Sequence, residues 1–539
     1  MKNKLLVVLT VFIGLFAFSS EKTSMASTAV QDAPKVLLVY DSCNAREDKE
    51  KDVDTLVRIL MSMGRQVTLV SMNDYQAGQL EKGKYEAVVT MINWPSMDFE
   101  NAAFEKDRQN FKGKKLHVGS NLTKSEQQEI PGQWVTLNEQ SFTLTDSDGL
   151  YEEQLSFQNK IQLLLKAQDG ETVVSNLVSK TGDQQSYPFG IVKDQNAYIP
   201  LFSSEGATLL SSMQLIAKWL GVKDSYTPYV AIENFTPLSS FTVADKFVRE
   251  LEDLENNVII TTTSTTDNTD TKTFKAYLKF LKIMTNNNHA ILYLNVPALN
   301  ASDSGNNDTL EEMMTQEVST LIENQIFPLG ISAPTYWNFD KYYQMNALDF
   351  GDAVLFTGMT NSPHFHTRTN TTQAFKTTFF NVSNDALANV HWNKNGGKYT
   401  AFTFPVPTVI SYQFPKTVKQ NEKLFKEIRN DPFPPTDQYL YRFNTGISTQ
   451  TQNLRGANGT ITLNDVPVDS INFDALQKQT NVKTNNTKQS KASTSRNIVD
   501  KVNDVLTVII LITLAVLVVL LLKGRKLYLR MFKNHDSKK

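Results

Sequence analysis

One carboxylate stands where a buried strand is expected to end. The apolar run Tyr229–Ile232 is followed directly by Glu233 and then by Asn234. A second apolar run, Ala290–Leu294, continues into a stretch that has no acid and no histidine. In a β/α barrel, the side chains just past the carboxyl ends of the strands carry the chemistry. Glu233 is therefore the one candidate catalytic residue, and the chemistry open to such a carboxyl group is general acid catalysis.

Glycoside hydrolysis needs a second carboxyl group, about 5–10 Å from the first. Asp340 and Asp352 are conceivable partners of Glu233. Metal chemistry has one weak candidate pair, His364 and His366, because histidines two apart share one face of a strand and can bind zinc. The next acid along the chain is distant, so we interpret both histidines as loop residues and expect no metal and no cofactor.

Aromatic residues gather after the apolar run Phe327–Ile331, near the expected mouth of a barrel. Aromatic faces stack on sugar rings, and neighbouring polar groups hydrogen-bond hydroxyls. The alternative is that these rings pack in the core. The glycan-binding candidates are Tyr336, Trp337, Asn338 and Asp340.

Two α/β modules are expected to position these residues. Residues 30–222 alternate short apolar runs with amphipathic segments, which predicts a doubly wound, flavodoxin-like sheet with a strand-rich insertion between Trp134 and Pro200. There is no GxGxxG and no P-loop, so the pattern does not support a nucleotide site. Residues 223–360 contain five expected strands with helices between them, which predicts an incomplete β/α barrel.

The remaining segments are assigned from composition. Residues 361–474 are expected either to finish the barrel or to form a small β-rich extension. Residues 1–29 have a basic start, an apolar stretch and small residues at the end, which predicts a signal peptide. Residues 475–503 predict a flexible stalk, 504–523 a single transmembrane helix and 524–539 a basic cytoplasmic tail.

The segments 1–29 and 475–539 together predict a single-pass protein of the cell membrane, in which most of the chain, on the N-terminal side of the transmembrane helix, is extracellular. The only cysteine is Cys43, so no intrachain disulfide can form. The formal net charge of -2 over 539 residues is near neutral and gives no sign of a nucleic-acid surface, which would need clustered positive charge, so no nucleic-acid partner is expected.

The order of motifs resembles the NodB-type polysaccharide deacetylase superfamily, and within it the YdaL-like secreted bacterial group, in which an α/β domain precedes the barrel. The resemblance covers roughly residues 34–360. It depends on Ile232–Pro237, Ile291–Leu299 and Phe327–Tyr336.

This resemblance implies a metal-dependent site in which an aspartate and two histidines bind a divalent ion. In this chain those positions fall on Asn234, Leu294 and Ala298, and a further histidine position falls on Thr335. None of these side chains is a good metal ligand. The resemblance therefore implies a deacetylase fold without its catalytic residues.

The expected function is that of a non-catalytic, membrane-anchored accessory or glycan-binding component in the production of a surface exopolysaccharide. Its partners would be the polysaccharide, a membrane glycan synthase complex, or both. One alternative is an active carbohydrate hydrolase or deacetylase that uses Glu233 with an unrecognised partner. Another is a surface scaffold that binds only protein.

Overall fold

The computed structural model describes residues 30, 32–42, 52–94, 101–180, 184–254, 258–265, 269–286, 290–297, 309–358, 365–395, 398–433, 445–457 and 459–471. The chain divides into two compact units, Met1–Ser470 and Ile471–Lys539. The predicted signal peptide, stalk, transmembrane helix and cytoplasmic tail all lie outside the described residues, as do Ala298 and His364. Among the helices that the structure describes, none is long and apolar enough to cross a membrane.

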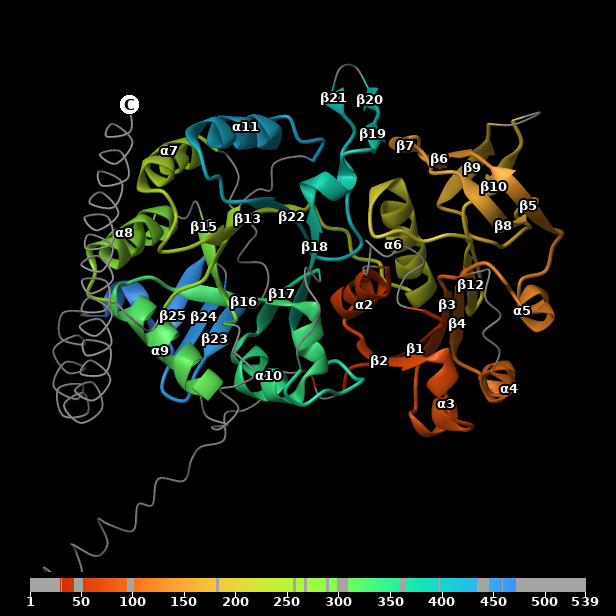
Figure 1. Cartoon of the computed structure of the whole chain (residues 1–539), viewed down its shortest axis with the longest axis horizontal. Helices are drawn as coiled ribbons and strands as arrows, with labels where there is room; N and C mark the ends of the chain where they lie inside the picture. Colours follow the sequence, from red (N-terminus) through yellow and green to blue (C-terminus); the bar gives the residue numbers. More distant parts are fainter. Residues whose placement is uncertain are drawn as a thin grey trace, which may run out of the picture. The chain divides into compact units, whose positions relative to one another are not determined.

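The first module is built on a six-stranded sheet with the order β11-β12-β4-β3-β1-β2 (Figure 1). Its strands β2, β1, β3, β4 and β12 run parallel, and β11 is antiparallel to β12. The order 2-1-3-4, continued by a fifth parallel strand, is that of flavodoxin-like sheets. The strands are β1 (Lys35–Tyr40), β2 (Gln66–Ser71), β3 (Ala87–Ile92), β4 (Lys114–Gly119), β11 (Ile191–Lys193) and β12 (Asn196–Ile199).

Helices alternate with these strands because apolar residues recur at helical spacing between the strand segments. In the first long helix, α2, ten of the eleven residues are buried, so it is covered on nearly all sides. The helices are α2 (Asp52–Ser62), α3 (Gln79–Lys82), α4 (Ala102–Asn110), α5 (Lys124–Glu129) and α6 (Gly206–Leu220), with the short 3-10 helix η1 (Met72–Asp74).

The strand-rich insertion forms two small sheets. One pairs β5 (Trp134–Gln140) with β8 (Gln158–Leu164). The other has the order β10-β9-β6-β7-β19. Its strands are β6 (Phe142–Asp146), β7 (Tyr151–Gln154), β9 (Ser175–Ser179), β10 (Ser186–Pro188) and β19 (His391–Trp392). Because β19 comes from far along the chain, the second module contributes a strand to the sheet of the first.

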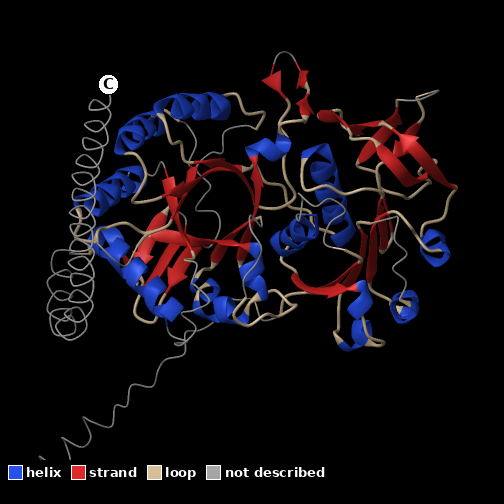
Figure 2. Ribbon diagram, in the orientation of Figure 1, coloured by secondary structure: helices blue, strands red, loops and turns tan. Residues whose placement is uncertain are grey.

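The second module is a closed barrel of parallel strands in the order β13-β14-β15-β16-β17-β18-β22, in which β22 pairs back to β13 (Figure 2). The strands are β13 (Tyr229–Phe235), β14 (Val258–Thr262), β15 (Ala290–Asn295), β16 (Pro328–Pro334), β17 (Ala353–Thr357), β18 (Thr377–Ser383) and β22 (Thr408–Gln413). The outer helices are α7 (Phe241–Glu252), α8 (Lys272–Asn286), α9 (Thr309–Glu323), α10 (Lys341–Asn346) and α11 (Val418–Arg429).

The prediction of an incomplete barrel that ends at residue 360 is therefore corrected. The five expected strands β13 to β17 are present, but β18 and β22 lie beyond residue 360 and close the ring. Strand β18 reads Thr-Thr-Phe-Phe-Asn-Val-Ser and follows a Thr- and Asn-rich segment, so its composition resembles a loop. Its first six residues are nevertheless buried, because parallel barrel strands are covered on both faces.

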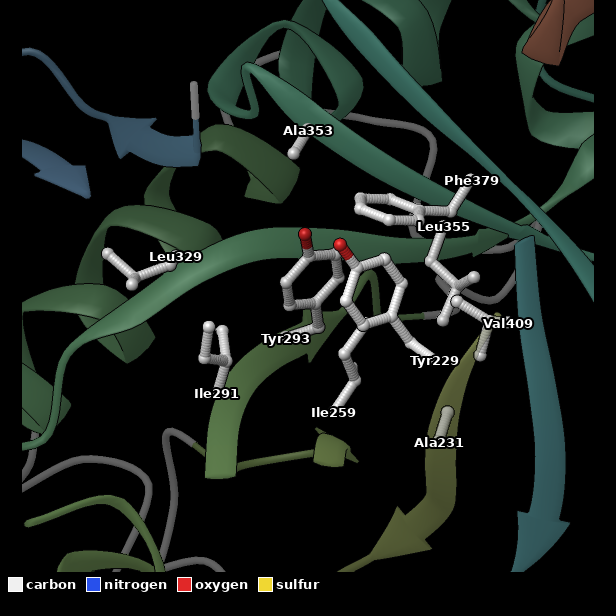
Figure 3. Packing of buried hydrophobic residues seen from close by; sticks show 10 residues of the cluster. All are labelled: Tyr229, Ala231, Ile259, Ile291, Tyr293, Leu329, Ala353, Leu355, Phe379 and Val409. Atoms are coloured by element: carbon white, nitrogen blue, oxygen red, sulfur yellow. The ribbon is translucent and has the colours of Figure 1, made fainter. Parts of the chain in front are cut away.

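The barrel interior is filled by alternate residues of its strands, which form one apolar cluster (Figure 3). Tyr229 and Tyr293 direct their rings into this cluster, and both pack edge-on against Phe379. Gly330 makes room for one of these rings, because a Cβ at this position would lie 2.5 Å from ring atoms of Tyr293. The cluster consists of Tyr229, Ala231, Ile259, Ile291, Tyr293, Leu329, Ala353, Leu355, Phe379 and Val409.

A four-stranded antiparallel sheet, β23-β24-β25-β26, covers the amino end of the barrel. Gly351 and Asp352, which directly precede β17, pair with this sheet: Gly351 bridges Ile447, and the Asp352 N–H donates to the carbonyl of Gly446 at 3.1 Å. Ile461 packs against the barrel cluster. The strands are β23 (Thr445–Ser448), β24 (Asn453–Ala457), β25 (Thr460–Leu463) and β26 (Val466–Pro467).

Residues 361–474 thus both finish the barrel and form a small β extension, which combines the two alternatives that the sequence left open. The segment also contains the hairpin β20 (Lys394–Asn395) and β21 (Lys398–Tyr399). Short 3-10 helices in this module are η3 (Thr335–Phe339), η4 (Leu348–Phe350), η5 (Asn384–Leu387) and η7 (Val468–Ser470).

Candidate functional site

A layer of polar side chains lies at the carboxyl ends of the barrel strands. Side chains alternate between the two faces of a strand, so the residue two positions after an interior residue also faces the interior. Moving two residues from each member of the apolar cluster toward the carboxyl end of its strand reaches a polar residue on six strands. They are Glu233 of β13, Thr261 of β14, Asn295 of β15, Thr357 of β17, Asn381 of β18, and Ser411 and Gln413 of β22.

Glu233 is the one ionisable residue in this layer, and its carboxylate is fully engaged. The side-chain amide of Asn381 donates to Oε1 at 2.6 Å, and the amide of Gln413 donates to Oε2 at 2.7 Å. Burial raises the pKa of Glu233, and the hydrogen bonds from Asn381, Gln413 and Ser411 oppose that rise. Glu233 is 9% exposed. The site therefore holds an acid whose proton affinity is increased at the end of a barrel strand.

Asn234, which stands where the resemblance implies an aspartate, supports the hydrogen bonds of Glu233 from the exposed side. Its backbone is left-handed, with φ of 66°, where strand β13 is irregular. Its side chain is exposed and donates to Oε1 of Gln413 at 2.9 Å, while its N–H donates to Oγ1 of Thr261 at 3.1 Å. Asn234 thus holds the amide of Gln413 in the orientation that serves Glu233.

Helix α2 of the first module contributes a buried ion pair to the same region. Arg58 donates from Nε to Oδ2 of Asp54 at 2.9 Å and from Nη1 to the carbonyl of Asn381 at 2.6 Å. Its guanidinium also lies 5.0 Å from the ring centre of Phe380. Asp54, Arg58, Asn381 and Glu233 therefore form a continuous chain of polar contacts from one module to the other.

Of the remaining positions implied by the resemblance, the structure describes Leu294 and Thr335. Leu294 alternates with the interior residues Tyr293 and Asn295, so its side chain lies on the outer face of β15. Thr335 is buried, and its hydroxyl donates to the carbonyl of Thr357 at 3.0 Å. Asn295 provides the polar group at the interior position and donates to Thr263 Oγ1 at 3.0 Å.

The two conceivable partner acids are engaged elsewhere. Asp352 lies at the opposite end of β17 from the polar layer, where it forms ion pairs with Arg455 and, at 3.0 Å, with Lys376. The carboxylate of Asp340 accepts backbone N–H groups from Tyr342 at 2.8 Å, from Thr367 at 3.1 Å and from His366. Neither forms a hydrogen bond with Glu233 among the contacts of the described residues.

Of the two histidines, the structure describes His366, whose ring packs 4.8 Å from that of Tyr342. No group of three or more side chains suited to hold a metal ion occurs within the described residues.

A cavity of about 1020 Å³ lies between the two modules. Tyr40 and Ser71 are the last residues of β1 and β2, and Tyr336 is the second residue after the end of β16. The cavity is therefore at the carboxyl ends of strands from both sheets, which is where ligands bind in α/β folds. Its lining comprises Tyr40, Val53, Asp54, Val57, Leu69, Val70, Ser71, Asp74, Gln76, Ala77, Gln79, Lys82, Gly83 and Tyr85 from the first module, and Tyr336, Phe339, Phe365, Arg368, Thr369 and Asn370 from the second.

Among the four predicted glycan-binding residues, Tyr336 lines this cavity and is half-buried. Trp337 is buried and stacks on Tyr343 with ring centres 4.4 Å apart. Asn338 is buried and exchanges hydrogen bonds with the backbone of Gln373 at 2.9 and 3.0 Å. Together with the backbone contacts of Asp340, the side chains of Trp337 and Asn338 fix the conformation of the segment that follows β16. Of the four predicted residues, only Tyr336 lines the cavity.

The segment 365–372 fixes one wall of the cavity in place, and we call it the clasp. On one side the Lys341 N–H donates to Thr367 O at 2.9 Å, and the Thr369 N–H donates to Phe339 O at 2.8 Å. On the other side it pairs with the edge strand β2, where Leu69 N–H donates to Asn370 O at 2.8 Å. The clasp therefore holds the second module against the first through backbone hydrogen bonds.

Several residues of the site could not be found by reading the chain in order. Arg58 and Asp54 show a signal only as an acid and a base four apart on an apolar helix. Asn381 and Gln413 lie in strands that were not assigned to the barrel, and Tyr40 and Tyr85 belong to the other module. No protein-family model matches the chain, and no curated protein matches it. The function must therefore be inferred from the polar layer around Glu233 and from the cavity between the two modules.

Proposed function

We propose that this protein binds a surface polysaccharide in the cavity between its two modules, as a non-catalytic component of polysaccharide production. The observation that carries the proposal is the presence of half-buried aromatic side chains on both walls of one cavity. Tyr40 and Tyr85 belong to the first module, and Tyr336, Phe339 and Phe365 to the second.

A pyranose ring matches such a cavity. Its two faces carry C–H groups that stack on aromatic rings, and its edge carries hydroxyls that need hydrogen-bonding partners. Gln76, Gln79 and Asn370 supply side-chain amides, each of which can both donate and accept. A volume of about 1020 Å³ is at the upper end for small-ligand sites, which suits more than one sugar unit.

The proposed lack of deacetylase activity is supported by residue types in the barrel. Asn234, Leu294 and Thr335 stand at positions where the NodB-type resemblance requires metal ligands, and the carboxylate of Glu233 already accepts two amide hydrogen bonds. We therefore propose a degenerate, YdaL-like relative of polysaccharide deacetylases. It would be anchored in the cell membrane by residues 504–523, with a surface polysaccharide or a membrane glycan synthase as its partner.

Binding of the full-length protein in mild detergent to an immobilised polysaccharide panel tests this proposal. Tyr336→Ala and Tyr85→Ala remove one ring from each wall, and each should weaken binding about fivefold or more, since stacking contacts are worth about 1 kcal/mol or more. Phe157→Ala is the matched control, because Phe157 is an aromatic residue that is 55% exposed and does not line the cavity. Absence of binding to every polysaccharide would contradict the proposal and favour a protein-binding scaffold.

A second function, general acid catalysis of sugar-bond cleavage, is favoured by one observation. Glu233 lies at the carboxyl end of a barrel strand and has a raised pKa, as general acids in hydrolases do. Release of reducing ends or acetate by the wild-type protein, and loss of that release in Glu233→Gln, would favour the enzyme over the binding protein. We expect no release from either protein.

A further inference from the structure

We infer that the cavity selects an acidic polysaccharide, one whose repeating unit carries a carboxylate. This inference rests on the proposed function and deepens it by naming the class of polymer. It is carried by the charged side chains of the cavity lining and by the way one of them is held.

In the part of the chain that the structure describes, four charged side chains line the cavity: Asp54, Asp74, Lys82 and Arg368. Asp54 is neutralised by Arg58, since their 2.9 Å ion pair is buried on both sides. Among the described residues, none provides an ion-pair partner for the other three. One acid and two bases therefore remain uncompensated, so the described lining presents a net positive charge to a ligand.

Arg368 is preorganised to bind a carboxylate. Its guanidinium lies 5.1 Å from the ring centre of Phe365, and the Phe365 ring in turn contacts Tyr336 with ring centres 6.3 Å apart. Its backbone is fixed by the clasp, in a bridge to Asp340. A guanidinium that is stacked on a ring keeps its N–H groups available for two parallel hydrogen bonds to a carboxylate. A sugar stacked on Tyr336 would therefore have a cation close to its edge.

Lys82 places a second cation on the opposite wall. It lies in α3 of the first module, whereas Arg368 belongs to the clasp of the second. Both side chains are exposed, so they can reach a ligand without the cost of a buried charge. Cations on two walls suit a polymer that carries acids along its length, because successive units can contact opposite sides. A neutral glucan would leave both cations unpaired.

The test compares full-length protein in mild detergent with three soluble probes: polygalacturonate as the acidic polymer, dextran as the neutral one and a glucosamine polymer as the cationic one. We expect the tightest binding to polygalacturonate, with affinity that falls as NaCl rises from 50 to 500 mM because exposed charges are screened. Arg368→Ala should weaken binding about tenfold or more, and Lys82→Ala severalfold.

Asp74→Asn should change the affinity in the opposite direction to Arg368→Ala and Lys82→Ala. Removing the uncompensated acid should strengthen binding of polygalacturonate severalfold, an effect that misfolding cannot produce. Arg368→Lys tests the geometry, since a lysine keeps the charge but loses the paired hydrogen bonds, and should bind with intermediate affinity. Lys106→Ala is the control, because Lys106 is exposed on α4 and does not line the cavity.

Equal affinity for dextran and polygalacturonate, with no effect of the charge variants, would overturn this inference and leave polysaccharide binding intact. Stronger binding of the glucosamine polymer would overturn it as well. If none of the three probes nor any other polysaccharide binds, the proposed function itself fails.

Discussion

Glu317 is an acid that the functional site does not use. It lies in α9, is 2% exposed, and its Oε2 atom has no hydrogen-bond partner among the described residues. Burial raises its pKa from an ordinary value of 4.5 to about 7, because the apolar surroundings disfavour the charged form. The folded protein therefore holds a proton here that the unfolded chain releases at lower pH.

This difference in proton binding makes stability depend on pH. A folded-state pKa above the unfolded one contributes stability at low pH that is lost as pH rises from about 4.5 to about 7. The loss is on the order of 3 kcal/mol for a shift of this size. Urea unfolding of wild type should show a lower midpoint at pH 8 than at pH 5, and Glu317→Gln should reduce that difference. Equal pH dependence in both proteins would contradict the assignment to Glu317.

Gly330 gives a second test at the scale of single residues. A Cβ at this position would lie 2.5 Å from the Tyr293 ring, so Gly330→Ala forces the ring out of the barrel core. We expect a loss of about 1–3 kcal/mol in the free energy of unfolding, as overpacked cores show. The cost should shrink in a Tyr293→Leu background, because the smaller side chain leaves room. A cost that is unchanged in that background would show that the strain lies elsewhere.

At the scale of elements, helix α2 packs in the core of the first module and also contacts the barrel through Arg58. Asp54 and Arg58 form an i, i+4 pair whose side chains are 2% and 8% exposed. Asp245 and Arg249 form a pair with the same spacing in α7, but their side chains are 57% and 75% exposed. The chain thus contains a buried ion pair and an exposed control with matched chemistry.

Removing the arginine should have very different effects in the two helices. Arg58→Ala leaves the buried carboxylate of Asp54 uncompensated and should cost about 3–5 kcal/mol. Arg249→Ala should cost about 0.3–0.5 kcal/mol, because water replaces the lost partner. Chemical unfolding measures both. Similar costs for the two variants would mean that α2 does not depend on its contact with the barrel.

Sequence patterns predicted those elements whose apolar residues follow a clear period. The flavodoxin-like strands β1 to β4 and the first five barrel strands are of this kind, since each is a short apolar run bounded by turn residues. Strand β18 escaped detection because threonine, asparagine and serine occupy several of its positions. The segment Thr408–Gln413 has a strand-like pattern and is strand β22, but its sequence does not indicate that it belongs to the barrel. The contacts of Arg58 were not predictable, because Asn381 is 323 residues away and no local pattern encodes that distance.

Positions of single site residues were predicted less well than the fold. Glu233 lies at the carboxyl end of β13, as expected from the strand that precedes it. The aromatic segment after β16 adjoins a cavity, but the sequence did not reveal that most of its polar side chains fix the backbone. The wall opposite Tyr336 belongs to the first module, and only the packing of the two modules brings that wall close to the segment after β16.

At the scale of the whole molecule, the clasp joins the two modules through backbone hydrogen bonds. Val67 N–H donates to Oγ1 of Thr372 at 2.9 Å, and Thr372 N–H donates to Val67 O at 2.9 Å. Thr372→Val removes the acceptor and leaves the buried N–H of Val67 without a partner, which should cost about 1–3 kcal/mol. Hydrogen exchange should accelerate at Val67, while amides of strand β1, which has a neighbouring strand on both sides, remain protected. Unchanged exchange at Val67 would contradict the pairing.

The clasp also covers the outer edge of a sheet. Strand β2 is the last strand of the six-stranded sheet, and an uncovered edge offers its N–H and C=O groups to strands of other molecules. Pairing with residues 370–372 occupies those groups within the chain. Substitutions that detach the clasp should therefore lead to self-association as well as a distorted cavity, so that solubility and ligand binding would be lost together.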